Sequence, residues 1–212
     1  NVRPETYHEI NNFYTATAYQ KGAEAIRTLR NYIGAEAFRR GMDIYFGRFD
    51  GAAATVEDFI GCFAEASGRD LAQFMRWYRQ AGTPPVPVKA THDAAARTLT
   101  LDLSQMIPAT PGQDKKLPHV IPVRLGLIGH DGKKLVVDTP GVSDYGGASA
   151  QELTTSAFIL ESASRRVIFR SVPEKPALSL LRAFSAPVRI ECETSDADLL
   201  ALARHDGDLF NR

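Results

Sequence analysis

The sequence carries no excess of either charge and no long apolar run. Lys plus Arg and Asp plus Glu each total 25 among its 212 residues, so the formal net charge is zero. Because surfaces that bind nucleic acid are typically basic, we expect no nucleic-acid partner. No stretch approaches the ~18 apolar residues of a spanning helix, and the first residues lack the regions of a secretory signal, so we expect no membrane partner. The chain begins at Asn1 rather than Met, which indicates a cut or processed product.

Cysteine is scarce as well. The two cysteines, Cys62 and Cys192, form no CxxC pair, so the sequence indicates neither a disulfide framework nor a cysteine zinc site. This usage is typical of a reducing compartment, and we expect a cytoplasmic protein. An apolar content of 44% with 24% charged residues is otherwise that of a soluble globular chain of one or two domains.

Motifs of self-contained active sites are missing too. The sequence has no HExxH, no GxSxG nucleophile elbow, no GxGxxG and no phosphate-binding P-loop. No two histidines are three or four positions apart, as metal ligands on one helix face would be; they are His8, His92, His119, His130 and His205. We therefore expect no metal bound to this chain, and no nucleophile and base pair supports a stand-alone enzyme of another class.

Up to about residue 82, apolar residues recur at three- and four-residue spacing, which is typical of helices that bury one face. A first helix is predicted from Thr15 to Ile33, with Gly34 in the left-handed conformation after it. Its apolar side would comprise Tyr19, Ala23, Ile26 and Leu29. A second helix would carry Phe38, Met42, Tyr45, Phe46 and Phe49.

Two further helices are predicted from their caps. Thr55 and Asp58 have the spacing of a capping box and would open a third helix that stops near Gly68. Asp70 would cap a fourth helix, which would bear Leu71, Phe74, Trp77 and Tyr78.

A period of two replaces the helical spacing after Gly82-Thr83-Pro84-Pro85, since proline cannot continue a helix. Alternating apolar residues predict strands at 99–103 and 121–127, and Asp131-Gly132 is a hairpin signal leading into 135–137. Further strands are expected at 86–90, 155–161, 166–170 and 187–192, so that seven short strands indicate a β-sandwich. Ser195 would then cap a last helix bearing Leu199, Leu200 and Leu202, which indicates the start of another domain.

One segment is rich in polar and aromatic residues, from Asn11 to Ala23 (NNFYTATAYQKGA). Spacing alone favours a structural interpretation, in which the Tyr19 ring is buried at the edge of the core. On the same grounds Asn11 and Asn12 would be helix caps or turn residues.

This segment, extended to NNFYTATAYQKGAEAIR, resembles the tyrosine helix that follows the zinc site in M1 aminopeptidases, specifically in the bacterial aminopeptidase N branch. Phe74 to Pro84 (FMRWYRQAGTP) resembles the end of that family's catalytic domain, and Ser185 to Val188 (SAPV) resembles a run near the end of its β-sandwich. The resemblance covers essentially the whole chain in order. Gln20 stands where that branch usually has Glu.

The resemblance implies an α+β multidomain fragment. Residues 1–85 would be the C-terminal helical part of a thermolysin-like catalytic domain, 86–192 an antiparallel, Ig-like β-sandwich, and 193–212 the truncated start of a helical domain. The family's GAMEN and HExxH motifs would lie before Asn1, so zinc would belong to the parent enzyme and this chain alone would be inactive. The rest of the parent chain would pack on the helical segment.

The resemblance also implies roles for three residues. Tyr19 matches the catalytic tyrosine that donates a hydrogen bond to the oxyanion formed when water attacks the scissile carbonyl of a peptide substrate. A phenol keeps its proton at neutral pH, so it can act as such a donor. Asn11 and Tyr14 match positions that line the substrate pocket. The alternative hypothesis, favoured by the missing HExxH, is a non-catalytic module that docks partners through its helices and sandwich.

Overall fold

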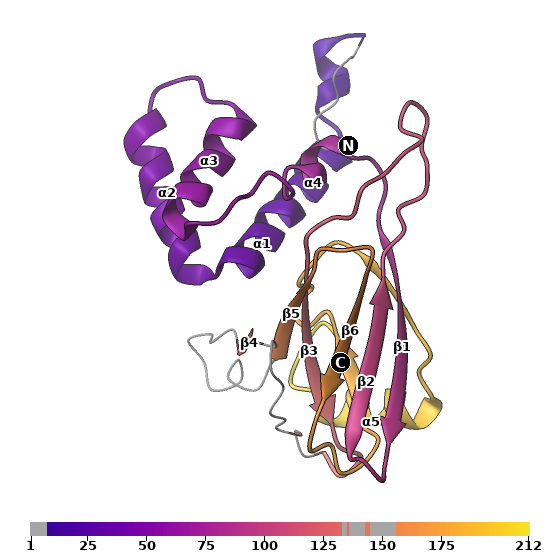
Figure 1. Cartoon of the computed structure of the whole chain (residues 1–212). Coiled ribbons are helices and arrows are strands. Elements are labelled where there is room, and N and C mark those ends of the chain that lie inside the picture. Colours follow the sequence, from indigo (N-terminus) through magenta and orange to yellow (C-terminus); the bar gives the residue numbers. More distant parts are fainter. Residues whose placement is uncertain (1–7, 133–134, 136–142, 145–155) are drawn as a thin grey trace.

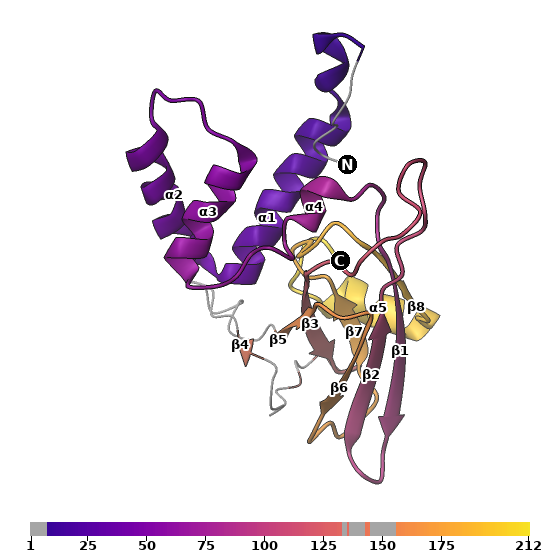
Figure 2. The ribbon, with the colours of Figure 1, turned by 45° about the horizontal axis from the view of Figure 1, so that its top comes forward.

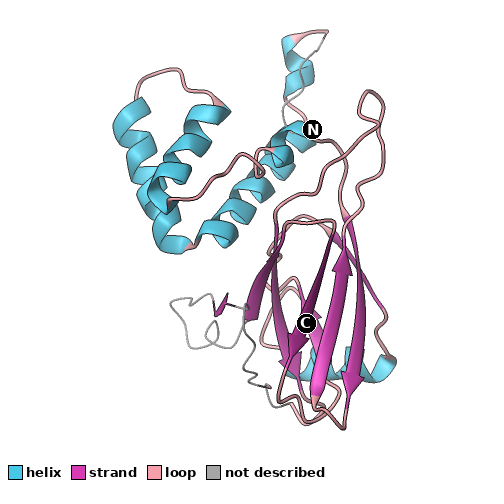
Figure 3. Cartoon of the chain, in the orientation of Figure 1, coloured by secondary structure: helices cyan, strands magenta, loops and turns pink. Residues whose placement is uncertain are grey.

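A computed structural model of the chain describes residues 8–132, 135, 143–144 and 156–212. Figure 1 shows a helical part that leads into a two-sheet sandwich, with the last helix across the far end of the sandwich. Figure 3 separates the same two parts by secondary structure. Among the described residues, no helix is long and apolar enough to cross a membrane.

From residue 8 onwards, where the structure describes the chain, the helical part contains six elements. They are η1 Ile10–Phe13, η2 Thr17–Lys21, α1 Gly22–Ile33, α2 Ala35–Phe49, α3 Val56–Ser67 and α4 Arg76–Arg79. The first is a 3-10 turn and the second is a π-helical segment that runs directly into α1. In Figure 2 these N-terminal elements extend beyond the rest of the molecule.

The predicted first helix is wrong in three respects. It is interrupted, because residues 17–21 are π-helical. Only Leu29 of the predicted apolar side is buried, while Tyr19 and Ile26 are exposed. The side of α1 that packs inward is the neighbouring one, and its buried residues are Ala25, Thr28, Leu29, Tyr32 and Ile33. Gly34 has the expected positive φ of 87°, but its ψ of 158° is not left-handed helical, since it also opens α2.

Helices α2 and α3 pack closely through aromatic side chains. A Cβ on Gly41 would lie only 2.3 Å from the Phe63 ring, so only glycine allows this approach. The Phe38 and Phe63 rings stack at 4.9 Å, and Tyr45 meets Phe59 edge-on at 5.0 Å. The predicted second helix is thus confirmed, although Phe46 is exposed.

The capping box of α3 is confirmed. The Asp58 amide donates to Thr55 Oγ1 at 3.1 Å, and Thr55 N donates to Asp58 Oδ2 at 2.9 Å. Gly68 ends α3 in the left-handed conformation with φ 66°.

The predicted fourth helix is wrong in length. Asp70 does accept a hydrogen bond, from Ala72 N at 2.8 Å, but residues 72–75 form turns and only Arg76–Arg79 are helical. The apolar residues of this segment nevertheless enter the core, and Trp77 is completely buried.

Among the described residues, the sandwich has two four-stranded sheets, ordered β6-β2-β1-β8 and β4-β5-β3-β7. Its strands are β1 Pro85–Asp93, β2 Thr98–Ser104, β3 Ile121–Ile128, β4 Ser143–Asp144, β5 Ser156–Leu160, β6 Ser164–Phe169, β7 Ala177–Leu180 and β8 Arg189–Cys192. Most pairs are antiparallel, but β1 and β8 run parallel, with Pro85 opposite Arg189. The sandwich is confirmed, whereas β4 and β7 were missed, and most of the predicted strand at 135–137 lies outside the described residues.

Helix α5 Asp196–His205 begins with the predicted cap. Asp198 N donates to Ser195 Oγ at 3.2 Å, and Ser195 N donates to Asp198 Oδ2 at the same distance. Leu202 is buried with Ile128 of β3. Leu199 and Leu200 are exposed and therefore lie on the outer face of the helix. In this structure α5 lies against β7 and β3.

One continuous apolar core joins the helical part to the sandwich. Hydrogen bonds cross the same junction: Trp77 Nε1 donates to Val120 O at 2.9 Å, and Asn31 Nδ2 donates to Ser185 O at 3.0 Å. The two parts therefore hold a defined relative position.

His119 is fully buried at this junction. Its ring lies 4.2 Å from that of Trp77, and Gln105 holds its backbone through two hydrogen bonds of 2.9 Å. Burial, with the positive charge of Lys21 as the next cause, lowers the pKa of His119 from 6.5 to about 3. The folded chain thus keeps this imidazole neutral.

We expect acid to destabilise the chain through His119. Below pH 6.5 His119 of the unfolded chain binds a proton, whereas His119 of the folded chain stays neutral until about pH 3. The free energy of unfolding should therefore fall with pH across this window, by up to about 1.4 kcal/mol per pH unit. Urea titrations near pH 7 and near pH 5 test this, because His119→Gln should lose less stability than the wild type. The control is His8→Gln, which replaces an exposed histidine. Equal losses of stability in the wild type and in His119→Gln would contradict the prediction.

Candidate functional site

Tyr19 lies on the π-helical segment η2, and its side chain is 63% exposed. Thr15 holds the start of this segment: its carbonyl accepts from Tyr19 N at 3.1 Å, and its hydroxyl accepts from Ala18 N at 3.2 Å. The interpretation of Tyr19 as a core residue with a buried ring is therefore wrong. An exposed phenol on a π-helical segment matters because such segments occur frequently at functional sites.

Tyr14 lies beside Tyr19. Their rings stack with centroids 6.3 Å apart and an angle of 25° between planes, and Tyr14 is 61% exposed. The structure thus brings these two predicted site residues together, and they form an aromatic face with hydroxyl groups that solvent can reach.

Asn11 is placed one turn earlier, on η1, and is exposed. Its carbonyl accepts from Tyr14 N at 3.3 Å, so the backbone links it directly to the aromatic pair. Asn12 has the capping role that spacing favoured, because its Oδ1 accepts from Glu9 N at 3.3 Å. The three candidate residues therefore lie in one short segment of the chain.

Lys21 was not singled out by sequence reasoning beyond its place in the segment from Asn11 to Ala23. Its Nζ donates to Gly82 O at 3.0 Å, a contact that joins the end of η2 to the segment after α4. Burial, and secondarily Lys116, lowers the pKa of Lys21. Only the motif could have indicated this residue, since nothing local predicts a partner so far along the chain.

The described residues do not offer a metal centre. Within them, no three His, Cys, Asp or Glu side chains are grouped so as to hold an ion. The arrangement supplies hydrogen-bond donors and aromatic contact area.

Two family matches cover most of the chain. Residues 1–78 match the family described as "Peptidase family M1 domain", and residues 82–193 match a domain of unknown function (DUF3458) described as having an Ig-like fold. The second description agrees with the sandwich in Figure 1.

Similar proteins are longer than this chain. An aminopeptidase N of Caulobacter vibrioides is 49% identical over 211 residues, which cover 100% of this chain and 22% of that protein. An aminopeptidase N of Escherichia coli is 40% identical over 211 residues, covering 100% of this chain and 23% of that protein. The crystal structure of Legionella pneumophila aminopeptidase A in complex with aspartic acid matches with a TM-score of 0.83 at 29% identity, again over 100% of this chain and 22% of that one. The chain thus spans less than a quarter of these relatives.

Proposed function

Because the chain belongs to the M1 peptidase family, in its aminopeptidase N branch, we propose that the protein containing it is a zinc-dependent aminopeptidase. It would hydrolyse N-terminal residues from peptides, and Tyr19 would stabilise the transition state. The observation that carries this proposal is the exposed Tyr19 on η2, inside the part of the chain that matches the M1 domain.

Tyr19 would act as a hydrogen-bond donor. As water adds to the scissile carbonyl, negative charge develops on the carbonyl oxygen, and a donor already in place stabilises that charge without reorganising. The exposure of Tyr19 leaves its hydroxyl free of the core and open to a bound peptide.

Asn11 and Tyr14 would line the substrate pocket beside this donor. Tyr14 stacks on the Tyr19 ring, so it can restrict the ring while presenting its own face to a substrate side chain. Asn11 is exposed on η1, three positions before Tyr14, and offers its side-chain amide to polar groups of the peptide.

Zinc would be held by other residues than those described, since these do not fit a metal site. When bound, the ion would polarise the carbonyl and activate water. Exposed apolar side chains of the helical part, such as Ile26 and Phe46, would then be covered by further parts of the longer protein.

We expect activity to require more than these residues. The full-length protein should release N-terminal residues from peptides and contain zinc, whereas the 212-residue chain should do neither. Hydrolysis of a peptide with a free amino terminus, measured alongside the metal content of both proteins, checks this. An acetylated peptide serves as the control, because an aminopeptidase should leave it intact. Zinc-independent hydrolysis by the full-length protein, or hydrolysis by the chain alone, would contradict the proposal.

The alternative is a non-catalytic docking module of helices and sandwich. It explains why the described residues hold no group of metal ligands, but it gives no reason for Tyr14 and Tyr19 to stack in the open. A full-length protein that binds no zinc and hydrolyses no peptide would favour it.

A further inference from the structure

The position of the Tyr19 hydroxyl depends on the backbone of η2. The ring is 63% exposed, and its aromatic contact is with Tyr14, which is itself 61% exposed. A surface pair of this kind moves with the segment that carries it. Runs of π-helix are rare, so a segment in this conformation persists only where surrounding contacts support it.

Lys21 provides such a contact. It is the last residue of η2, two positions after Tyr19, and its side chain is half-buried. Its Nζ donates to Gly82 O at 3.0 Å across 61 positions of sequence. This bond therefore ties the end of the π-helical segment to the connection between α4 and β1.

The acceptor is itself held in place. Gly82 has φ +98°, which favours glycine, and a Cβ there would lie 3.5 Å from Ile107 Cγ2. The preceding residue, Ala81, is bound on both sides: its N–H donates to Gln113 Oε1 at 2.9 Å, and its carbonyl accepts from Lys116 Nζ at 3.1 Å. The carbonyl that Lys21 contacts thus belongs to a fixed backbone.

These contacts come from the loop between β2 and β3, residues 105–120, which rises from the sandwich towards the helical part in Figure 1. Gln113 Nε2 also donates to Arg79 O at 2.8 Å. Gln80 exchanges two hydrogen bonds of 2.8 Å with the Leu117 backbone. These contacts from the β2–β3 loop therefore hold residues 79–82 in place.

The two lysines lie close enough to affect each other. Burial lowers the pKa of Lys21, with Lys116 as the second cause, and burial also lowers the pKa of Lys116. Each ammonium group donates to neutral oxygens of the junction, and Lys116 also reaches Thr110 Oγ1 at 2.7 Å. Placing two like charges together is unfavourable, and hydrogen bonds to neutral oxygens hold both ammonium groups in this arrangement.

We propose that Lys21 is a positioning residue for Tyr19. It anchors η2 to Gly82 and, through Gln113 and Lys116, to the β2–β3 loop of the Ig-like sandwich. The inference rests on the proposed catalytic role of Tyr19 and extends it, because the sandwich then takes part in holding the donor where substrate charge develops. A displacement of about 1 Å in such a group can lower the rate by about 100-fold.

The test uses the full-length protein with zinc bound. Lys21→Met keeps the length of the side chain but removes the donor, and it should lower kcat for peptide hydrolysis by about 10- to 100-fold with little change in KM or zinc content. Lys21→Arg retains donors at a similar reach and should recover part of the loss. Lys115→Met removes a neighbouring exposed ammonium group and should leave kcat unchanged. Lys116→Met should lower kcat less than Lys21→Met, since it acts one contact further away.

A double-mutant cycle separates positioning from a general structural defect. If Lys21 acts through Tyr19, Lys21→Met should cost much less in the Tyr19→Phe background than in the wild type. An equal loss in both backgrounds, or a kcat for Lys21→Met like that of Lys115→Met, would overturn the inference while leaving the proposed function intact.

Amide hydrogen exchange distinguishes the two proposals. Lys21→Met should accelerate exchange in residues 17–21, and Lys115→Met should not. Normal turnover in Tyr19→Phe would overturn the proposed role of Tyr19 even if the exchange result held. Unchanged exchange in Lys21→Met would overturn the anchor itself.

Discussion

Tyr19→Phe in the full-length protein should lower kcat by about 100- to 1,000-fold while its zinc content stays unchanged. The substitution removes one preorganised hydrogen-bond donor, and such losses typically cost about 3 to 4 kcal/mol in the barrier. The ring remains, so the stack with Tyr14 survives. Because Tyr19 is 63% exposed, loss of its hydroxyl leaves no polar partner unsatisfied in the core.

The matched control is Tyr45→Phe. Tyr45 lies on α2 and packs edge-on against Phe59, so the same chemical change is made away from η2. Turnover should be measured with a free-amino-terminus peptide at saturating concentration, with zinc determined on the same samples. Near-normal turnover in Tyr19→Phe, or an equal loss in Tyr45→Phe, would remove Tyr19 from the mechanism.

Local signals in the sequence predicted local structure well. The capping box predicted at Thr55 and the N-cap predicted at Ser195 depend only on neighbouring residues, and both are present. Alternation in β2 likewise predicted which side chains face the core, since Leu99, Leu101 and Leu103 are all buried.

Features set by distant contacts were not predictable in this way. Seen alone, residues 70–79 favour a full helix, but the segment forms turns and a short helix, and Trp77 donates to Val120 O of the sandwich. The parallel pairing of β1 with β8 joins strands from opposite ends of the sandwich sequence. No local pattern encodes such partners.

The candidate site shows the same difference between features set by local sequence and features set by distant contacts. Resemblance of one motif supplied Tyr19, Tyr14 and Asn11, which the structure places in one segment. Their roles stay predictions. The motif gave neither the π-helical backbone under Tyr19 nor the bond from Lys21 to Gly82, and that bond joins residues 61 positions apart.

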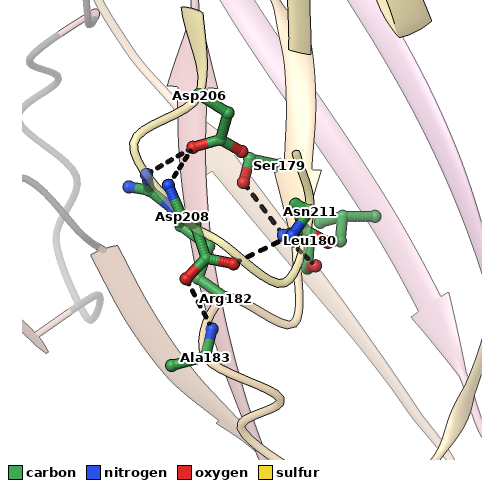
Figure 4. A network of polar contacts seen from close by, with 7 residues as sticks. All are labelled: Ser179, Leu180, Arg182, Ala183, Asp206, Asp208 and Asn211. Atoms are coloured by element: carbon green, nitrogen blue, oxygen red, sulfur yellow. Dashed lines mark hydrogen bonds and ion pairs between the residues drawn. The ribbon is translucent and has the colours of Figure 1, made fainter. Parts of the chain in front are cut away.

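A buried ion pair lies near the C-terminal end of the chain. Arg182 Nη2 lies 2.6 Å from Asp206 Oδ1, and the two side chains are only 5% and 0% exposed (Figure 4). Asp208 N also donates to Asp206 Oδ1, at 3.0 Å. The guanidinium lies so close to β3 that a Cβ on Gly126 would be 2.8 Å from Nη1.

The segment after α5 is fastened to the end of β7 around this pair. Asp208 Oδ1 accepts from Ala183 N at 2.8 Å, and Asn211 Nδ2 donates to Leu180 O at 2.8 Å and to Ser179 Oγ at 3.0 Å (Figure 4). Residues 206–211 thus follow α5 back onto the sandwich and satisfy polar groups there.

Asp206→Ala should therefore destabilise the chain by about 3 to 5 kcal/mol. It removes the carboxylate that lies beside the buried Arg182 guanidinium, and breaking a buried ion pair by removing one partner typically costs that much. Asp102→Ala is the matched control, because it removes a carboxylate that also lies 2.6 Å from an arginine, Arg166, but at the surface, where solvent screens both charges. Denaturant titration of the purified chains should show a much smaller shift for that variant, and equal shifts would contradict the prediction.

Replacing both partners discriminates further between charge and packing. Arg182→Met with Asp206→Leu removes both charges at once, and apolar replacement of a buried pair is often neutral or stabilising. The double variant should recover much of the stability lost in Asp206→Ala, although the Asp208 amide loses its acceptor. Failure to recover would mean that the cost lies in those surrounding hydrogen bonds, and that Asp206 serves mainly to organise residues 206–211 rather than to neutralise Arg182.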